Sequence, residues 1–132
     1  MSLEANKEVV RSFYAEAMNG RDSYACERWL SRAFVHNGVK RGREGQREIV
    51  AHFLAAFEPL EHRILLLLAE GELVAAHQRW KGRQVGEFLG CPPSGREVTF
   101  TSTAVLKIAG GEIVEAWDEL DTGPIIAQMT VA

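Results

Sequence analysis

The feature that most restricts the fold is a strict alternation of apolar and polar residues between positions 96 and 109. Successive side chains of a strand point to opposite faces, so this period of two predicts a strand with one buried face. Gly110-Gly111 follows at once, and a Gly-Gly pair between two strand patterns is typical of a tight hairpin. The face predicted to be buried carries Val98, Phe100, Ser102, Ala104, Leu106 and Ile108.

The order of the predicted elements indicates the fold class. Apolar residues at helical spacing predict helices at about 6–18, after the candidate N-cap Asp22, and at about 44–57 before Pro59. Strands are predicted at 61–70, 72–82, 96–109 and 112–121, with a loop at 83–95 and a tail at 122–132. Helices followed by antiparallel strands favour an α+β fold in one domain, 1–132. A strongly curved sheet covered by helices would form a cone with a pocket in its mouth.

Composition excludes several classes of protein. The 132 residues carry a formal net charge of −3, so no nucleic acid partner is expected. The longest apolar stretch, Ile64 to Ala69, is too short to span a membrane, and no secretory leader is expected. Cys26 and Cys91 lack metal or CxxC spacing, which favours reduced thiols and a cytoplasmic location. No dinucleotide, phosphate-loop or zinc motif is present, so no metal or other cofactor is expected.

One carboxylate falls on an otherwise apolar face. In the strand 112–121 the even positions are apolar except for Asp118, and the hairpin brings position 118 close to Ala104 on the inner face. Desolvation in an apolar pocket raises the pKa of a carboxyl group, as a general acid or base near neutral pH requires. A bulge would exchange Asp118 for Asp121, and a solvated aspartate at the end of a strand is the alternative to both.

Histidine and arginine side chains are further candidates. His77 and Arg79 lie two residues apart in one predicted strand, so they share a face with Leu73 and Ala75, and this face is predicted to point inward. There His77 could relay a proton and Arg79 could hold a carboxylate or an enolate. A packed core histidine with Arg79 paired at the surface fits equally well. His36 follows an aromatic–aliphatic pair, which favours the pocket over a surface turn.

Aromatic side chains predict an apolar pocket. Tyr14 lies on the inner stripe of the first helix, where its hydroxyl could donate to a ligand, although core packing fits as well. Ser102 is assigned to the same pocket. The expected ligand is a small apolar molecule, flat or with several rings, although each aromatic residue alone also fits a plain core position. The aromatic residues assigned to the pocket are Trp29, Phe53, Phe57, Phe88 and Phe100.

Three other side chains are predicted at the surface. His52 is expected at the rim of the pocket and His62, beside charged neighbours, at the surface. Trp117 lies between Glu115 and Glu119 on the face opposite Asp118. An exposed tryptophan on a sheet suggests that a second subunit covers that face, so a homodimer is expected.

Several segments resemble the SnoaL-like polyketide cyclase family, and together they extend over nearly the whole chain. They are GEFLGCPPSGREVTF (86–100), KIAGGEIVEAWDELD (107–121), NKEVVRSFYAEAMNGRD (6–22), FVHNG (34–38) and IIAQM (125–129). The resemblance implies the nuclear transport factor 2-like fold, which ketosteroid isomerase, scytalone dehydratase and limonene epoxide hydrolase share. It also implies ring closure by an intramolecular aldol reaction without a cofactor, and dimers formed through the sheet.

The resemblance assigns roles to particular residues. The catalytic aspartate of the family corresponds to Asp118, and a pocket histidine corresponds to His36. The sequence departs from the family pattern at His77, where an arginine is usual. It departs again at Gly82 to Gly86, where Gly-Thr-His-x-Gly is frequent.

Two functions follow as hypotheses. In the first, the chain is a cofactor-free enzyme in which Asp118 moves a proton while His36, His77, Arg79 or Tyr14 stabilises an oxyanion. Ring closure, isomerisation, dehydration and epoxide hydrolysis all fit such a pocket. In the second, the same fold is a non-catalytic module for small-molecule binding or dimerisation. The environment of the Asp118 carboxylate distinguishes the two.

Overall fold

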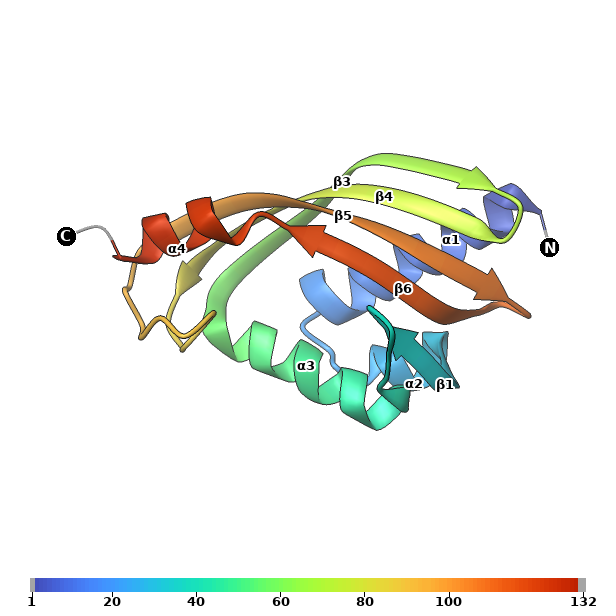
Figure 1. The fold of residues 1–132 in the computed structure, drawn as a ribbon, viewed down its shortest axis with the longest axis horizontal. Coiled ribbons are helices and arrows are strands. Elements are labelled where there is room, and N and C mark those ends of the chain that lie inside the picture. Colours follow the sequence, from blue (N-terminus) through green and yellow to red (C-terminus); the bar gives the residue numbers. More distant parts are fainter. Residues whose placement is uncertain (1, 131–132) are drawn as a thin grey trace.

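A computed structural model describes residues 2–130 as an open, curved sheet with helices on its concave side (Figure 1). The sheet has six strands in the order β2-β1-β6-β5-β4-β3. Strands β3 to β6 pair antiparallel, whereas β1 pairs parallel with β6. The α+β expectation is confirmed, but β2 and β3 remain edges, so the sheet does not close into a barrel. The strands are β1 (Leu30–His36), β2 (Val39–Lys40), β3 (Phe57–Glu70), β4 (Leu73–Gln84), β5 (Glu97–Ala109) and β6 (Glu112–Leu120).

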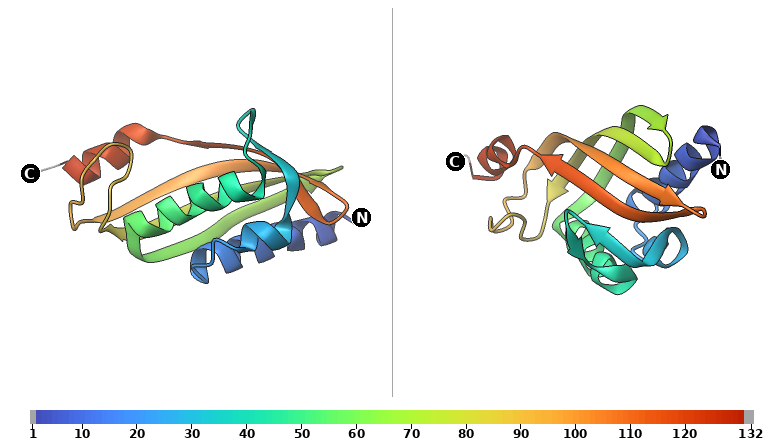
Figure 2. Two further views of the ribbon diagram at one scale, coloured as in Figure 1. Left: turned by 90° about the horizontal axis from the view of Figure 1, so that it is seen from below. Right: turned by 45° about the vertical axis from the view of Figure 1, so that its right-hand side comes forward.

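Helices α1 and α3 cover the sheet, and α4 lies beside the N-terminal end of β5 (Figures 1 and 2). None of the helices in the described part of the chain is long and apolar enough to cross a membrane. The helical elements are α1 (Leu3–Tyr14), the π-type turn η1 (Ala15–Asn19), α2 (Ala25–Trp29), α3 (Gly42–Ala56) and α4 (Thr122–Thr130).

Helix α1 begins at Leu3, earlier than the predicted start near residue 6, and passes into η1 after Tyr14. Ser2 caps it, since its hydroxyl accepts a hydrogen bond from the Ala5 amide at 3.0 Å. The apolar stripe of α1 is buried and continues through η1. After the turn, the Arg21 guanidinium donates to the carbonyl oxygens of Leu54 and Phe57. This contact joins the end of η1 to the junction between α3 and β3.

The end of helix α3 and the C-terminal tail differ from the sequence prediction. Helix α3 ends at Ala56, and Pro59 lies inside β3 instead of closing the helix. A proline is tolerated there because β3 is an edge strand, where a missing amide donor leaves no partner unpaired. The predicted tail contains α4, whose Ile125 and Met129 are buried beside Phe57 and Val98.

The predicted hairpin is confirmed in position and register. Gly110 and Gly111 have φ angles of 59° and 79°, the left-handed values that a type I′ turn requires. Ala104 lies opposite Asp118, so both side chains point to the concave face.

The phase predicted for strand β4 is wrong. Its buried side chains are Val74, Ala76, Gln78 and Trp80, whereas His77 and Arg79 point to the convex face. Ala76 pairs with Ala104, so both lie on the concave face. Apolar residues occur on both faces of this strand, and alternation alone therefore could not determine its orientation.

Candidate functional site

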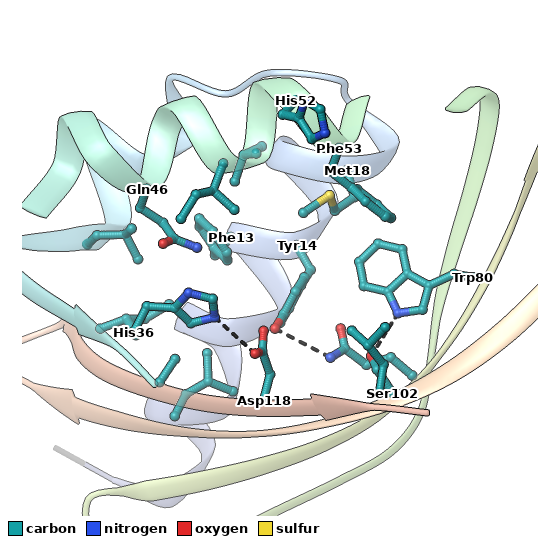
Figure 3. Close-up of a pocket in the computed structure, with 18 of the residues that line it drawn as sticks. Phe13, Tyr14, Met18, His36, Gln46, His52, Phe53, Trp80, Ser102 and Asp118 are labelled. Carbon is teal, nitrogen blue, oxygen red and sulfur yellow. Dashed lines mark hydrogen bonds and ion pairs between the residues drawn. The ribbon is translucent and has the colours of Figure 1, made fainter. Parts of the chain in front are cut away.

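An apolar cavity of about 300 Å³ lies between the concave face of the sheet and helices α1 and α3 (Figure 3). Helix α1 contributes Tyr14, helix α3 contributes Phe53, and the sheet contributes the floor. Most of the lining is hydrocarbon, with a few polar groups between the rings. The aromatic members are Phe13, Tyr14, Phe34, Phe53, Trp80, Phe88 and Phe100.

The aromatic side chains pack mainly edge to face. Phe53 makes T-shaped contacts with Trp80 and Phe88, with ring centroids 5.1 and 5.5 Å apart. The Trp80 indole N–H donates to the Ser102 hydroxyl at 2.8 Å, which satisfies a buried polar group on each side. These contacts hold the rings in one arrangement, so the walls of the cavity are preformed.

Asp118 is the carboxylate of this cavity. Its Oδ1 lies 2.9 Å from His36 Nε2 and accepts a second hydrogen bond from Asn37 Nδ2 at 3.0 Å. The Asp118 amide in turn donates to Asn37 Oδ1 at 2.8 Å. Within the described residues no hydrogen bond reaches Oδ2, so this oxygen is available to a ligand.

Both partners of Asp118 come from the end of strand β1, where His36 is the last residue and Asn37 follows it. The parallel pairing of β1 with β6 sets His36 opposite Ala116. Asn37 follows in the left-handed region at a φ of 48°, a conformation that asparagine tolerates. His36 stacks on Phe34 and is 16% exposed in its side chain.

The predicted direction of the Asp118 pKa is wrong. Burial raises this pKa, but the hydrogen bond and charge of His36, together with Asn37, outweigh burial and leave it below its usual value. The Asp118 side chain is also 37% exposed, so its desolvation is incomplete. Asp118 is therefore ionised near neutral pH, which suits a base or a hydrogen-bond acceptor and not a general acid.

A second polar group faces the cavity at Tyr14. Its hydroxyl accepts a hydrogen bond from Gln78 Nε2 at 3.4 Å, and Gln78 Oε1 lies 2.6 Å from His62 Nε2. Burial chiefly raises the pKa of Tyr14, with a contribution from the Asp118 charge, so the hydroxyl stays protonated. His62 was predicted at the surface and is buried instead, with a lowered pKa caused by desolvation.

The structure brings together most of the predicted site residues. Those that line the cavity are Tyr14, His36, Phe53, Phe88, Phe100, Ser102 and Asp118. His52 lies at the rim as expected, with Nε2 3.1 Å from Glu87.

Five predicted residues lie elsewhere. His77 is on the convex face, where its Nδ1 lies 2.9 Å from Thr103 Oγ1, and Arg79 shares that face. Asp121 is exposed beyond the end of β6. Phe57 is fully buried in a separate core cluster, and Trp29 packs against the main core without reaching the cavity.

The sequence prediction missed Gln46, Gln78 and Trp80, which line the cavity, and His62 behind it. Gln78 and Trp80 occupy alternate positions of β4 and would have been identified had the strand phase been known. Gln46 lies on the α3 side of the cavity, and its Oε1 is buried without a hydrogen-bond partner among the described residues. Within the same residues, no three His, Cys, Asp or Glu side chains lie together as a metal site needs.

Comparison with known proteins gives consistent results. The sequence profile of the SnoaL-like polyketide cyclase family matches residues 8–129. TsrD from Streptomyces laurentii superposes with a TM-score of 0.90 at 26% identity, over 100% of this chain and 99% of TsrD.

Two further structures are similar. IdmH from Streptomyces antibioticus gives a TM-score of 0.80 at 25% identity, over 96% of this chain and 99% of IdmH. A SnoaL-like polyketide cyclase from Agrobacterium tumefaciens gives 0.83 at 20% identity, over 97% and 98%, a level that supports the fold alone. Among curated proteins none matches this chain.

Proposed function

The chain belongs to the SnoaL-like polyketide cyclase family, and we propose that it is a cofactor-free enzyme that uses Asp118 as a base on an apolar carbonyl compound. One observation carries the proposal. An ionised carboxylate lines a preformed aromatic cavity, and His36 and Asn37 both bind the same one of its two oxygens.

The proposed reaction begins with proton transfer. Asp118 Oδ2 takes a proton from a carbon next to a carbonyl group, and the electron pair of that C–H bond moves onto the carbonyl oxygen. The Tyr14 hydroxyl donates to this developing oxyanion, and the His36 N–H continues to hold the carboxyl group. Attack of the enolate carbon on a second carbonyl of the same substrate closes a ring. The new alkoxide then recovers the proton from Asp118, so atoms and charge balance.

An ionised carboxylate with a lowered pKa is a weak base in water. A ligand that fills the cavity removes water from Asp118, which disfavours the charged form and strengthens it as a proton acceptor. The free energy gained when an apolar ligand binds in the cavity therefore favours the proton transfer, because only a ligand that covers the carboxylate completes its desolvation.

The same observation favours a second candidate. A carboxylate with a lowered pKa is also suited to accept a hydrogen bond from a ligand hydroxyl without any reaction. Under this alternative the chain is a small-molecule-binding module of the same fold.

A proton-exchange experiment separates the two candidates. The probe is 2-tetralone, a two-ring ketone with acidic C–H bonds, in deuterated buffer, and NMR follows its deuterium uptake. We expect faster exchange with the wild-type protein and a loss of about 100-fold or more in Asp118→Asn. Asp121→Asn is the matched control, since Asp121 lies outside the cavity. Binding of 2-tetralone without faster exchange would instead support the module.

We also propose that a second copy of the chain covers the convex face. The strand register places Leu68, Ala75, Val105 and Trp117 in one row across four strands. Leu68 is 65% exposed and Trp117 is 40% exposed, so the row forms an exposed apolar band on the convex face. A two-fold dimer would bury the same band from both subunits.

A further inference from the structure

A chain of polar groups runs from the edge strand β3 to the cavity. His62 on β3 contacts Gln78 on β4, and Gln78 contacts Tyr14 on α1, with distances of 2.6 and 3.4 Å. His62 is 7% exposed, Gln78 1% and Tyr14 8%. Only Tyr14 and Gln78 reach the cavity, so His62 acts through them.

The atoms in contact give this chain a direction. Gln78 Oε1 can only accept, so the His62 nitrogen that faces it, Nε2, must carry the proton. Gln78 Nε2 can only donate, so the Tyr14 oxygen accepts from it. The Tyr14 proton therefore cannot point back toward Gln78 and is left to donate into the cavity, which Tyr14 and Asp118 both line (Figure 3).

Packing restricts the His62 ring to this orientation. The ring stacks on Tyr14 with centroids 4.9 Å apart and an interplanar angle of 23°, and its centroid lies 4.3 Å from that of Trp80. The His62 backbone amide also donates to Asn19 Oδ1 at 3.2 Å. An imidazole tilted out of this plane would lose the stacking on Tyr14, and one turned over would lose the contact between Nε2 and Gln78 Oε1.

We propose that His62 and Gln78 are positioning residues that orient the Tyr14 hydroxyl as a hydrogen-bond donor to an acceptor oxygen of the ligand. The site then selects ketones and other molecules with an acceptor oxygen over hydrocarbons of the same shape. The inference rests on the proposed function only for the presence of such a ligand, since it concerns binding and needs no reaction.

Selectivity for an acceptor oxygen is measured with two probes. Titration calorimetry gives the dissociation constants of 2-tetralone and of tetralin, which lacks the carbonyl group. The dissociation constant of tetralin divided by that of 2-tetralone, here called the affinity ratio, measures how much the carbonyl group contributes to binding. We expect Tyr14→Phe to lower this ratio about three- to tenfold, the value of one neutral hydrogen bond. Gln78→Glu should lower it equally although Tyr14 is retained, because a carboxylate accepts the Tyr14 proton and draws it away from the ligand.

Changes at His62 provide the matched comparison. His62→Phe keeps an aromatic ring against Tyr14 but removes the donor, which frees the Gln78 amide to turn and accept from Tyr14. We expect a lower ratio in His62→Phe and an unchanged ratio in His77→Phe, the same substitution on the convex face. An unchanged ratio in both Gln78→Glu and His62→Phe would overturn the inference.

A spectroscopic measurement on the wild-type protein avoids dependence on variants that fail to fold. Nitrogen NMR of the imidazole distinguishes the two neutral tautomers, and we expect the His62 proton on Nε2. A proton on Nδ1 alone would reverse the chain, because Gln78 would then donate to His62 and accept from Tyr14. That result would overturn the inference.

Failure of this inference is distinguishable from failure of the proposed function. If 2-tetralone exchanges no faster with the protein but the affinity ratio still depends on Tyr14 and Gln78, the enzyme proposal fails and the positioning role stands. If Asp118 accelerates exchange while the affinity ratio is unchanged by both Tyr14→Phe and Gln78→Glu, the positioning role fails and the enzyme proposal stands.

Discussion

Replacing Gln78 by leucine separates the structural value of the buried polar chain from its role in binding. The substitution keeps the volume close to that of glutamine but removes the acceptor that lies 2.6 Å from His62 Nε2. A buried donor without a partner costs about 1–3 kcal/mol, and the side chains involved are almost fully buried. The 3.4 Å bond to Tyr14 adds little, because that hydroxyl borders the cavity. We therefore expect Gln78→Leu to lower the free energy of unfolding by about 2 kcal/mol.

A double-mutant cycle isolates the interaction itself. His62→Phe alone leaves Gln78 Oε1 without its donor and should cost a similar amount. The double variant removes both polar partners, so neither unsatisfied group remains. We expect its loss of stability to fall short of the sum of the single losses by about 1–2 kcal/mol.

Urea denaturation followed by far-ultraviolet circular dichroism measures each free energy, and equal m-values would show that the unfolding reactions are comparable. His77→Phe combined with Gln78→Leu is the matched cycle, since His77 contacts Thr103 on the other face. Single effects of the His62–Gln78 cycle that add within about 0.5 kcal/mol would refute the reasoning.

The buried His62 side chain should make the free energy of unfolding depend on pH. Desolvation lowers the pKa of His62 in the folded protein, so the unfolded chain binds a proton at a higher pH than the folded one. Stability from neutral His62 is then complete above the unfolded pKa of about 6.5 and declines as the pH falls toward the folded pKa. In His62→Phe we expect the free energy of unfolding to fall less than in the wild-type protein as the pH is lowered from 7.5 into the acid range. The same pH profile in both proteins would contradict this expectation.

Three further results are expected. The rate of deuterium exchange into 2-tetralone that the protein catalyses should be constant through neutral pH and fall in acid as Asp118 becomes protonated. His36→Phe removes a donor that lowers the Asp118 pKa, so the measured rate should begin to fall at a higher pH. Ala116→Leu should fill part of the cavity and weaken 2-tetralone binding about tenfold or more by calorimetry, with a stability change of less than about 1.5 kcal/mol because the added carbons enter empty space. Trp117→Lys should convert a dimer to a monomer in analytical ultracentrifugation, whereas a wild-type monomer would remove the basis for the proposed interface.

Strand alternation was sufficient where one face of a strand is clearly apolar. In β5 and β6 it predicted the hairpin, the register and the inward direction of Asp118. In β4 it failed, because Leu73 and Ala75 on the face of His77 are as apolar as the residues beside Gln78 on the other face. His62 was misassigned for a related reason, since its charged neighbours Glu61 and Arg63 point outward while His62 itself points inward.

Local periodicity and turn chemistry were enough to predict the α+β class, the concave face of the central hairpin and the presence of one carboxylate on it. How that carboxylate behaves depends on contacts between elements that are distant in the chain. His36 and Asn37 reach Asp118 from β1 through a parallel pairing that joins residues about 80 positions apart. Their hydrogen bonds lower a pKa that the apolar face alone predicted to rise. The donor direction of Tyr14 likewise arises only where α1, β3 and β4 meet, since hydrogen bonds between elements depend on positions that no local pattern records.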